Sequence, residues 1–207
     1  QVRSRLKAIL SRENADLVHV RSRVPAWIAL PAAATLGIAT VSTVHGRFIT
    51  TSAFKRVYNR KLLKTDHVIA ISNYVKELIT RQYVGVEGRL TVVHRGVDID
   101  LFNPNNVNQA RIVNLVEDLS IPEDVPVIML PARATKWKGH QILLQALAKI
   151  KDRPFICLMI GAGDGKLAFM SELVRYGQQL GLEGRFRLTP LVNDMPAALM
   201  VADVVAM

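Results

Sequence analysis

Short apolar runs rich in β-branched residues alternate along the chain with stretches typical of helices. We predict strands at the apolar runs 16–20, 39–44, 67–71, 90–93, 125–130, 155–160, 185–189 and 203–207. We predict helices between them at 25–36, 52–63, 73–82, 139–150, 166–180 and 194–201. Strands that are apolar throughout and joined by helices are typical of parallel sheets covered on both faces. The pattern therefore predicts an α/β protein.

This alternation is interrupted between residues 98 and 125. The interruption contains Asn103-Pro-Asn-Asn106, a weak polar helix and the sequence Ile121-Pro-Glu-Asp. We place a domain boundary there, which gives two α/β halves, 1–110 and 111–207. Ligands of such sheets bind beyond the carboxyl ends of the strands, so the residues that directly follow a strand are the candidates for a site.

A charge-free stretch at residues 24–44 is long enough to cross a bilayer. It contains Pro25, Pro31 and Gly37, however, and is better explained as a buried helix, a turn at Gly37 and a buried strand. We expect no signal peptide before it. We therefore expect a soluble, cytoplasmic protein that is at most peripheral to a membrane.

Composition narrows the class of protein. Half of the 207 residues are apolar, which excludes a disordered or collagen-like chain. A single cysteine, Cys157, excludes a disulfide framework and a thiolate zinc site, and the five histidines show no metal-ligand spacing. We expect no metal. The chain begins at Gln1 and ends within a predicted strand, so we expect a piece of a longer protein.

The net charge of +10 is concentrated in the first half. Residues 1–110 hold 16 Lys and Arg against 7 Asp and Glu, whereas residues 111–207 hold 11 against 10. The densest basic stretch lies in one predicted helix and comprises Lys55, Arg56, Arg60, Lys61 and Lys64. It is either a solvated helix face or a surface for anionic lipid headgroups or a phosphorylated acceptor. No known nucleic-acid-binding motif appears in the chain, so we expect no nucleic-acid partner.

Two post-strand segments carry candidate chemistry. After the strand at 39–44 come His45, which can exchange a proton near neutral pH, and Gly46, which lets the backbone approach a ligand. A hydrogen-bonded structural histidine is the alternative. After the strand at 125–130 come Arg133 and Lys138, five residues apart, before a predicted helix. Two cations at a helix amino terminus suit a diphosphate, the alternative being a solvated basic turn.

A glycine loop follows the strand at 155–160. Its sequence, Gly161-Ala-Gly163-Asp-Gly165-Lys166, has neither the spacing of a dinucleotide-binding fingerprint nor that of a Walker loop. It nevertheless lies at the same predicted sheet edge as Arg133 and Lys138. Cys157 lies inside the preceding strand, where we expect a buried core thiol.

Taken in order, these segments resemble glycosyltransferase family 4. The acceptor-side half of that family is similar to 16–20, 22–27, 43–46, 68–72, 95–98 and 102–104. Its nucleotide-sugar half is similar to Arg133-x4-Lys138-Gly139, to the strand leading to Gly161-Ala-Gly163, and to 202–205. The resemblance covers nearly the whole chain and keeps the order of the family's motifs.

The resemblance implies a GT-B-like α/β fold, with two Rossmann-like parallel-sheet halves facing across a cleft, both incomplete here. It implies a retaining transferase that needs no metal and no cofactor. Arg133 and Lys138 would hold the donor diphosphate, and His45 would be the catalytic histidine near the transferred sugar. The donor pocket would be bordered by Gly46, Gly161, Gly163, Leu191 and Val192. Arg95 and Asp98 match the loop that leads to the interdomain hinge.

Two parts of the family pattern are missing from the chain. The paired-glutamate motif that contacts the donor sugar should follow residues 203–205, and a glycine-rich loop should lie near the amino terminus. We therefore expect the 207 residues alone to be inactive and the parent protein to be an enzyme.

The function that we expect is hexosyl transfer from a nucleotide-sugar donor to a sugar or lipid-linked acceptor in cell-envelope polysaccharide, lipopolysaccharide or glycolipid synthesis. An anionic membrane surface at the inner face of the cytoplasmic membrane is an expected partner. Two alternatives stay open: another GT-B enzyme, such as a sugar-nucleotide epimerase, and a non-catalytic phosphate-binding module.

Overall fold

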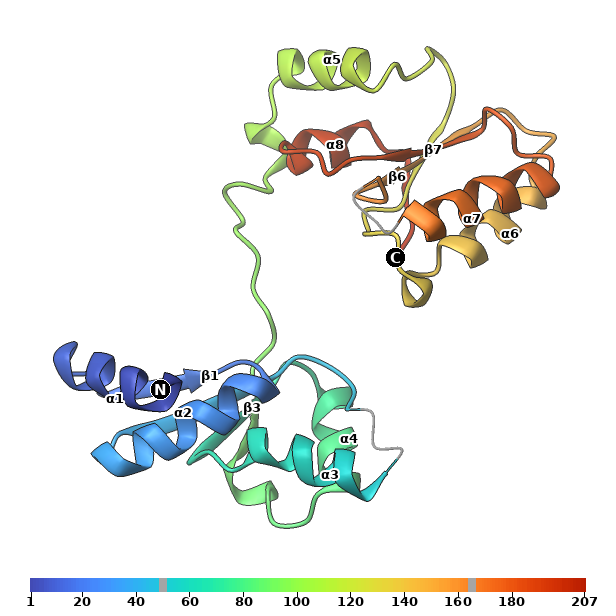
Figure 1. Ribbon diagram of the computed structural model, residues 1–207. Helices are drawn as coiled ribbons and strands as arrows, with labels where there is room; N and C mark the ends of the chain where they lie inside the picture. The colour runs from blue at the N-terminus through green and yellow to red at the C-terminus, as the bar shows by residue number, and fades with distance from the viewer. Residues whose placement is uncertain (49–51, 164–166) are drawn as a thin grey trace. The chain divides into compact units, whose positions relative to one another are not determined.

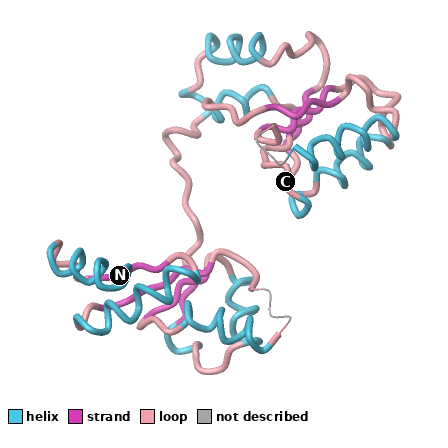
Figure 2. Tube along the Cα trace, in the orientation of Figure 1, coloured by secondary structure: helices cyan, strands magenta, loops and turns pink. Residues whose placement is uncertain are grey.

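The computed structural model describes residues 1–48, 52–163 and 167–207. The chain divides into two compact units, Gln1–Gly96 and Val97–Met207. Each unit has a four-stranded sheet with helices packed against it, as the ribbon in Figure 1 and the tube in Figure 2 show. All paired strands are parallel, which confirms the predicted fold class.

The sheet of the first unit has the order β1-β2-β3-β4. Its strands are β1 (Leu17–Val20), β2 (Ala39–Val44), β3 (His67–Ala70) and β4 (Leu90–Val92). Its helices are α1 (Val2–Arg12), α2 (Arg23–Leu36), α3 (Ala53–Arg60) and α4 (Asn73–Gln82), with short 3-10 helices η1 (Lys61–Leu63) and η2 (Glu87–Arg89). Because all four strands are parallel, their carboxyl ends share one edge of the sheet.

The charge-free stretch of the first unit forms a large part of its core. Helix α2 buries Ala26, Leu30 and Ala33, and it ends at Gly37 in a left-handed conformation (φ +67°) before β2 begins. The predicted helix, turn and strand are thus confirmed. Among the described residues, no helix has the length and apolarity needed to cross a bilayer.

The sheet of the second unit has the order β7-β6-β5-β8. Its strands are β5 (Val127–Met129), β6 (Ile156–Ile160), β7 (Phe186–Thr189) and β8 (Val204–Val205). Its helices are α5 (Gln109–Asp118), α6 (His140–Ala148), α7 (Leu167–Gln179) and α8 (Met195–Val201), with 3-10 helices η3 (Pro104–Asn106) and η4 (Lys136–Lys138).

Strand β6 is buried on both faces, as its uninterrupted apolar sequence predicts. Cys157 and Met159 pack in a cluster with residues of α6 and α7. Ile156, Leu158 and Ile160 pack in a second cluster with residues of α5 and α8. Figure 1 shows the two helix pairs on opposite sides of the strands. A central strand covered on both faces is open only at its ends, and ligands of such sheets bind at the carboxyl ends.

The structure differs from the sequence predictions in the linker and at the amino terminus. The units divide between Gly96 and Val97, earlier than the boundary that we placed at residue 110. One reason is that the guanidinium of Arg111 donates to the carbonyl of Asn106 and also to the carboxylate of Asp194. These contacts tie the linker around Asn106 to the second unit. Helix α1, which has no buried residue, was not predicted.

Most strand ends lie one or two residues inside their predicted ranges. The predicted helix 166–180 is observed as α7 from Leu167 onward. Residues Asp164–Lys166, which include the last glycine of the predicted loop, lie outside the described residues.

Candidate functional site

The loop after β5 carries both cations that we predicted to bind a diphosphate. It remains attached to the neighbouring strand beyond β5, because the amide of Ala132 donates to the carbonyl of Ile160 at 2.9 Å. It then forms η4 and enters α6 through Gly139, whose φ of +79° is a left-handed conformation that favours glycine. Arg133 and Lys138 are therefore presented at the carboxyl edge of the second sheet.

Three loops meet at this edge, and a glycine lies where they meet. A Cβ atom on Gly161 would lie 3.7 Å from Cδ1 of Leu191 and 3.8 Å from the backbone nitrogen of Arg133. The amide of Gly161 also donates to the carbonyl of Pro190 at 3.2 Å. The structure thus brings together Arg133, Gly161 and Leu191, which follow three different strands and which the sequence predicted as site residues.

Gly163 is packed more tightly than Gly161. A Cβ atom there would lie 2.8 Å from the backbone nitrogen of Pro190 and 2.8 Å from the carbonyl carbon of Thr189, so the position has no room for a side chain. Its amide donates to the carbonyl of Thr189 at 2.8 Å. Val192, the neighbour of Leu191, is half-buried and packs against the cluster beneath α5 and α8. Leu191, which is exposed, faces Gly161 instead.

The two cations are exposed. Neither Arg133 nor Lys138 belongs to an ion pair among the described residues, and Nζ of Lys138 lies 4.4 Å from the centroid of the Trp137 ring. No side chain of the described residues caps the start of α6. Uncapped amides at a helix amino terminus carry partial positive charge, so this loop and helix start present only positive charge to a ligand.

Buried polar atoms without a hydrogen-bond partner gather around the same loops. Among the described residues of the second unit, these atoms are Oγ1 of Thr135, Nδ1 of His140 and Oγ1 of Thr189. Buried polar groups are nearly always hydrogen-bonded, and exceptions often mark functional positions. Thr135 lies between the two cations, His140 begins α6 and Thr189 ends β7, so the exceptions coincide with the three-loop junction.

His140 holds the β5 loop in place. It is fully buried, its Nε2 atom lies 3.1 Å from the carbonyl oxygen of Ala132, and its ring packs edge-on against Phe169. Burial is the main cause that lowers the pKa of His140, followed by the charge of Lys138. The imidazole is therefore neutral at pH 7, with Nε2–H as the donor to Ala132. No local sequence pattern predicts this contact.

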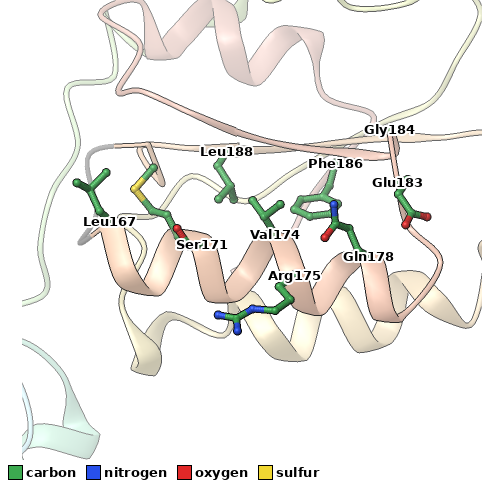
Figure 3. Close-up of a pocket in the computed structure, with 10 residues that line it drawn as sticks. Leu167, Ser171, Val174, Arg175, Gln178, Glu183, Gly184, Phe186 and Leu188 are labelled. Carbon is green, nitrogen blue, oxygen red and sulfur yellow. The ribbon is translucent and has the colours of Figure 1, made fainter.

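A separate groove of the second unit does not involve these residues. It has a volume of about 710 Å³ and lies between α7 and edge strand β7, as Figure 3 shows. Val174, Phe186 and Leu188 give it an apolar floor, with Arg175 and Glu183 at its rim. It contains none of the predicted site residues.

At the carboxyl edge of the first sheet, His45 lies between two arginines. Nε of Arg21, directly after β1, is 3.4 Å from Nε2 of His45. A guanidinium nitrogen of Arg95, after β4, is 2.6 Å from Nδ1. Gly46 has no atom within 4 Å of the position that a Cβ would take, so the space beside His45 is open.

His45 also lines a small pocket of about 200 Å³. Partial burial lowers the pKa of His45 first, and the charges of Arg95, Arg21 and His19 lower it further. The ring is therefore neutral at pH 7. Arg23, which lines the same pocket, is held by the Oδ1 atom of Asn59 at 2.9 Å and by the faces of Phe48 and Tyr58.

The predicted hinge residues are divided between the units. Arg95 contacts His45 in the first unit, whereas Asp98 belongs to the second, where its Oδ1 atom accepts from the amides of Asp100 and Leu101. The described residues contain no group of three His, Cys, Asp or Glu placed to hold a metal ion. Cys157 is buried in β6, as expected.

Comparisons with known proteins agree with this architecture. Residues 1–101 match the sequence model of Glycosyltransferase Family 4. The D-inositol 3-phosphate glycosyltransferase of Xylanimonas cellulosilytica is 30% identical over 145 residues, which are 69% of this chain and 34% of that protein.

Solved structures share the fold over nearly all of the chain. A glycosyltransferase from Rickettsia africae is 31% identical with a TM-score of 0.83, over 98% of this chain and 54% of that one. Anabaena HepE in complex with UDP-glucose is 22% identical with a TM-score of 0.84, over 98% of this chain and 55% of that one. The fold is that of the GT-B glycosyltransferases, and the chain spans 34% to 55% of the length of these three proteins.

Proposed function

We propose that this chain, which belongs to glycosyltransferase family 4, is part of an enzyme that transfers a sugar from a nucleotide-diphosphate sugar to an acceptor. The observation that carries the proposal is the junction of three loops at the carboxyl edge of the second sheet. There, Arg133 and Lys138 precede an uncapped helix beside the turn at Gly161. The likeness to a glycosyltransferase at 31% identity and the UDP-glucose complex of HepE support a nucleotide-sugar donor.

In this proposal Arg133 and Lys138 bind the donor diphosphate. Breaking the bond between sugar and phosphate increases the negative charge on the leaving diphosphate. Cations fixed beforehand at that position stabilise the transition state more than the ground state, and so accelerate transfer. The guanidinium can bind two oxygens at once, whereas the ammonium acts as a point charge. Gly161, Gly163 and Leu191 border the pocket, with Leu191 rather than Val192 in position to contact the nucleobase.

His45 and Gly46 act on the sugar side. A neutral imidazole can hydrogen-bond a sugar hydroxyl, and the open space at Gly46 leaves room for the ring.

The resemblance to glycosyltransferase family 4 underlies two further parts of the proposal, retention of the anomeric configuration and independence from metals and cofactors. For the second, the cations of the β5 loop supply the charge stabilisation that a metal would give. Turnover by the parent protein that persists in EDTA would support it, and loss restored by a divalent cation would refute it.

The acceptor in this proposal is a sugar or lipid-linked sugar of the cell envelope, reached from the inner face of the cytoplasmic membrane. Helix α3 supports membrane attachment, because Phe54 and Val57 are 79% and 63% exposed on a helix that also carries Lys55 and Arg56. Co-sedimentation with anionic vesicles at low salt tests this part. Equal binding to neutral vesicles, or no binding, would refute it.

Binding of UDP to the 207-residue chain tests the donor site. We expect Arg133→Ala and Lys138→Ala each to weaken UDP binding by about tenfold or more, because each removes a charge-assisted contact. Lys149→Ala, at the other end of α6, is the matched control and should leave the affinity unchanged. In the parent protein the double variant should lose transfer by several orders of magnitude. UDP binding that is insensitive to both substitutions would refute the donor site.

A further inference from the structure

Two hydrogen-bond donors face each other at the carboxyl edge of the first sheet. A guanidinium has only N–H donors, so both Arg21 and Arg95 must donate wherever they contact His45. A neutral imidazole has one N–H and one acceptor nitrogen. Nδ1, at 2.6 Å from Arg95, is the closer and therefore the accepting nitrogen. The proton is then on Nε2, which points at the Nε–H of Arg21 across 3.4 Å.

The N–H groups of Arg21 and His45 face each other without an acceptor between them, so a ligand that brings an acceptor atom could bind to both. The two nitrogens, 3.4 Å apart, can share a single oxygen about 2.8 Å from each once the Nε–H of Arg21, which points at Nε2, turns toward that oxygen. An anionic oxygen suits the position best, since charge-assisted hydrogen bonds are about twice as strong as neutral ones. The adjoining pocket of about 200 Å³ has room for the group that carries this oxygen.

The first unit offers no carboxylate at this edge that could serve instead. The first unit has sixteen Lys and Arg against five Asp and Glu. Four of the acids, Glu13, Asp16, Asp66 and Glu87, precede strands and so lie toward the opposite edge of the sheet. The fifth, Glu77, pairs with Arg81 on α4.

By contrast, an arginine follows three of the four strands within three residues. Arg21, Arg47 and Arg95 stand at this edge, and none of them belongs to an ion pair among the described residues. The next acid along the chain, Asp98, turns its Oδ1 atom to two backbone amides. These arginines therefore make this edge of the sheet basic.

We propose that Arg21 and His45 together bind one oxyanion, a carboxylate or a phosphate group, carried by a sugar substrate of this protein. Nε of Arg21 and Nε2 of His45 donate to the same oxygen. Arg95 is a positioning residue, which fixes the ring by donating to Nδ1. The inference rests on the proposed function in that the ligand is a sugar. It deepens that function by naming the substrate class, a charged sugar rather than a neutral one.

The test uses the full 207-residue chain with its histidine rings labelled with ¹⁵N and ¹³C. Glucose 6-phosphate and glucuronate are the charged probes, and glucose is the neutral one. We expect the Nε2 signal of His45 to move with both anions and not with glucose. The pKa of His45 should rise when an anion binds, because the negative charge offsets the arginines that now depress it.

Arg21→Gln should weaken binding of both anions by about 10- to 100-fold, since a contact to a charged group is lost. Arg21→Lys keeps the charge without the planar fork and should fall between. Arg5→Gln, an exposed position on α1, is the control for net charge. Arg95→Gln should alter the ring ¹⁵N pattern that reports the tautomer. Unmoved His45 signals, an equal response to glucose, or equal weakening by Arg5→Gln would overturn the proposal.

Two further arms identify which substrate carries the charge. If it is the donor, UDP-glucuronate should bind more tightly than UDP-glucose, and Arg21→Gln should abolish the preference. If it is the acceptor, glucose 6-phosphate should still move the His45 signals when UDP-glucose is saturating. Finding neither would refute the inference. UDP binding that still depends on Arg133 would then leave the proposed function standing.

Discussion

Asp194 accepts two parallel hydrogen bonds from Arg111, with 2.8 Å between Nε and Oδ2 and 2.7 Å between the terminal nitrogen and Oδ1. This pair joins α5 to α8 in the second unit. Oδ1 also accepts from the amide of Ala197 at 3.1 Å, so the same carboxylate caps α8. The hydrogen bonds from Arg111, followed by the one from the amide, lower the pKa of Asp194 to about 2.

We predict that this pair makes the second unit sensitive to acid. In the unfolded chain Asp194 takes up a proton near pH 4, whereas in the folded chain it does so only near pH 2. The stabilisation is therefore complete above about pH 4 and is lost as the pH falls through 2. Asp194→Asn, which retains a capping side chain, should lower the free energy of unfolding at pH 7 but not at pH 2. Urea unfolding at the two pH values measures this, with the exposed Asp152→Asn as control. An equal deficit at both values would contradict it.

Gly163→Ala should destabilise the second unit. The new Cβ would lie 2.8 Å from backbone atoms of Thr189 and Pro190, and a strand end cannot yield as a flexible side chain can. Overpacking of this kind costs about 1–3 kcal/mol. Gly88→Ala is the control, because nothing lies within 4 Å of its Cβ position, and it should change stability by less than about 1 kcal/mol. Thermal unfolding of both variants checks this, and equal melting temperatures would refute the close approach.

His140→Phe should weaken donor binding while changing the free energy of unfolding only slightly. Phenylalanine keeps the packing against Phe169 and removes the unpartnered Nδ1, which offsets the lost hydrogen bond to Ala132. We expect the free energy of unfolding to change by less than about 1.5 kcal/mol. UDP binding should nevertheless weaken by about tenfold, because the loop that carries Arg133 loses its anchor. Calorimetric titration with UDP measures this, and His67→Phe in the first unit should have no effect. Unchanged affinity would mean that His140 only fills the core.

A strand could be predicted well where the sequence marks both of its ends. Strand β2 has the predicted bounds, since Gly37 stops the preceding helix and His45 follows the last apolar residue. Serine is a residue type typical of helix caps, and Oγ of Ser72 accepts from the amide of Val75 at 3.2 Å at the start of α4. Helix α1 was not predictable in this way. It has no buried residue, and tertiary contact with α2 rather than its own pattern holds it.

The site was predictable to the extent that it depends on strand ends. Arg133, Gly161 and Leu191 each follow a strand, and parallel strands end at one edge, so the structure brings them together while their roles remain predictions. The contacts of His45 could not be foreseen. Arg21 lies 24 residues before it and Arg95 lies 50 after it, and no local pattern specifies which side chains will meet across a sheet.

Cys157 provides a reporter for opening of the second unit. Burial in β6 raises the pKa of its thiol to about 12, so at pH 8 only about one folded molecule in 10,000 carries the reactive thiolate. We predict that a thiol reagent such as DTNB labels the native chain far more slowly than the urea-unfolded chain. The labelling rate should then follow the population of the opened state.

This reporter also localises the effect of Gly163→Ala. A loss of about 1–3 kcal/mol in the second unit should raise the labelling rate by about 5- to 150-fold. Gly88→Ala lies in the first unit, whose core contains no cysteine, and should leave the rate unchanged. Rapid stoichiometric labelling of the native chain would mean that β6 is not covered on both faces. Equal acceleration by the two variants would mean that the two units unfold together rather than as the separate cores that their packing indicates.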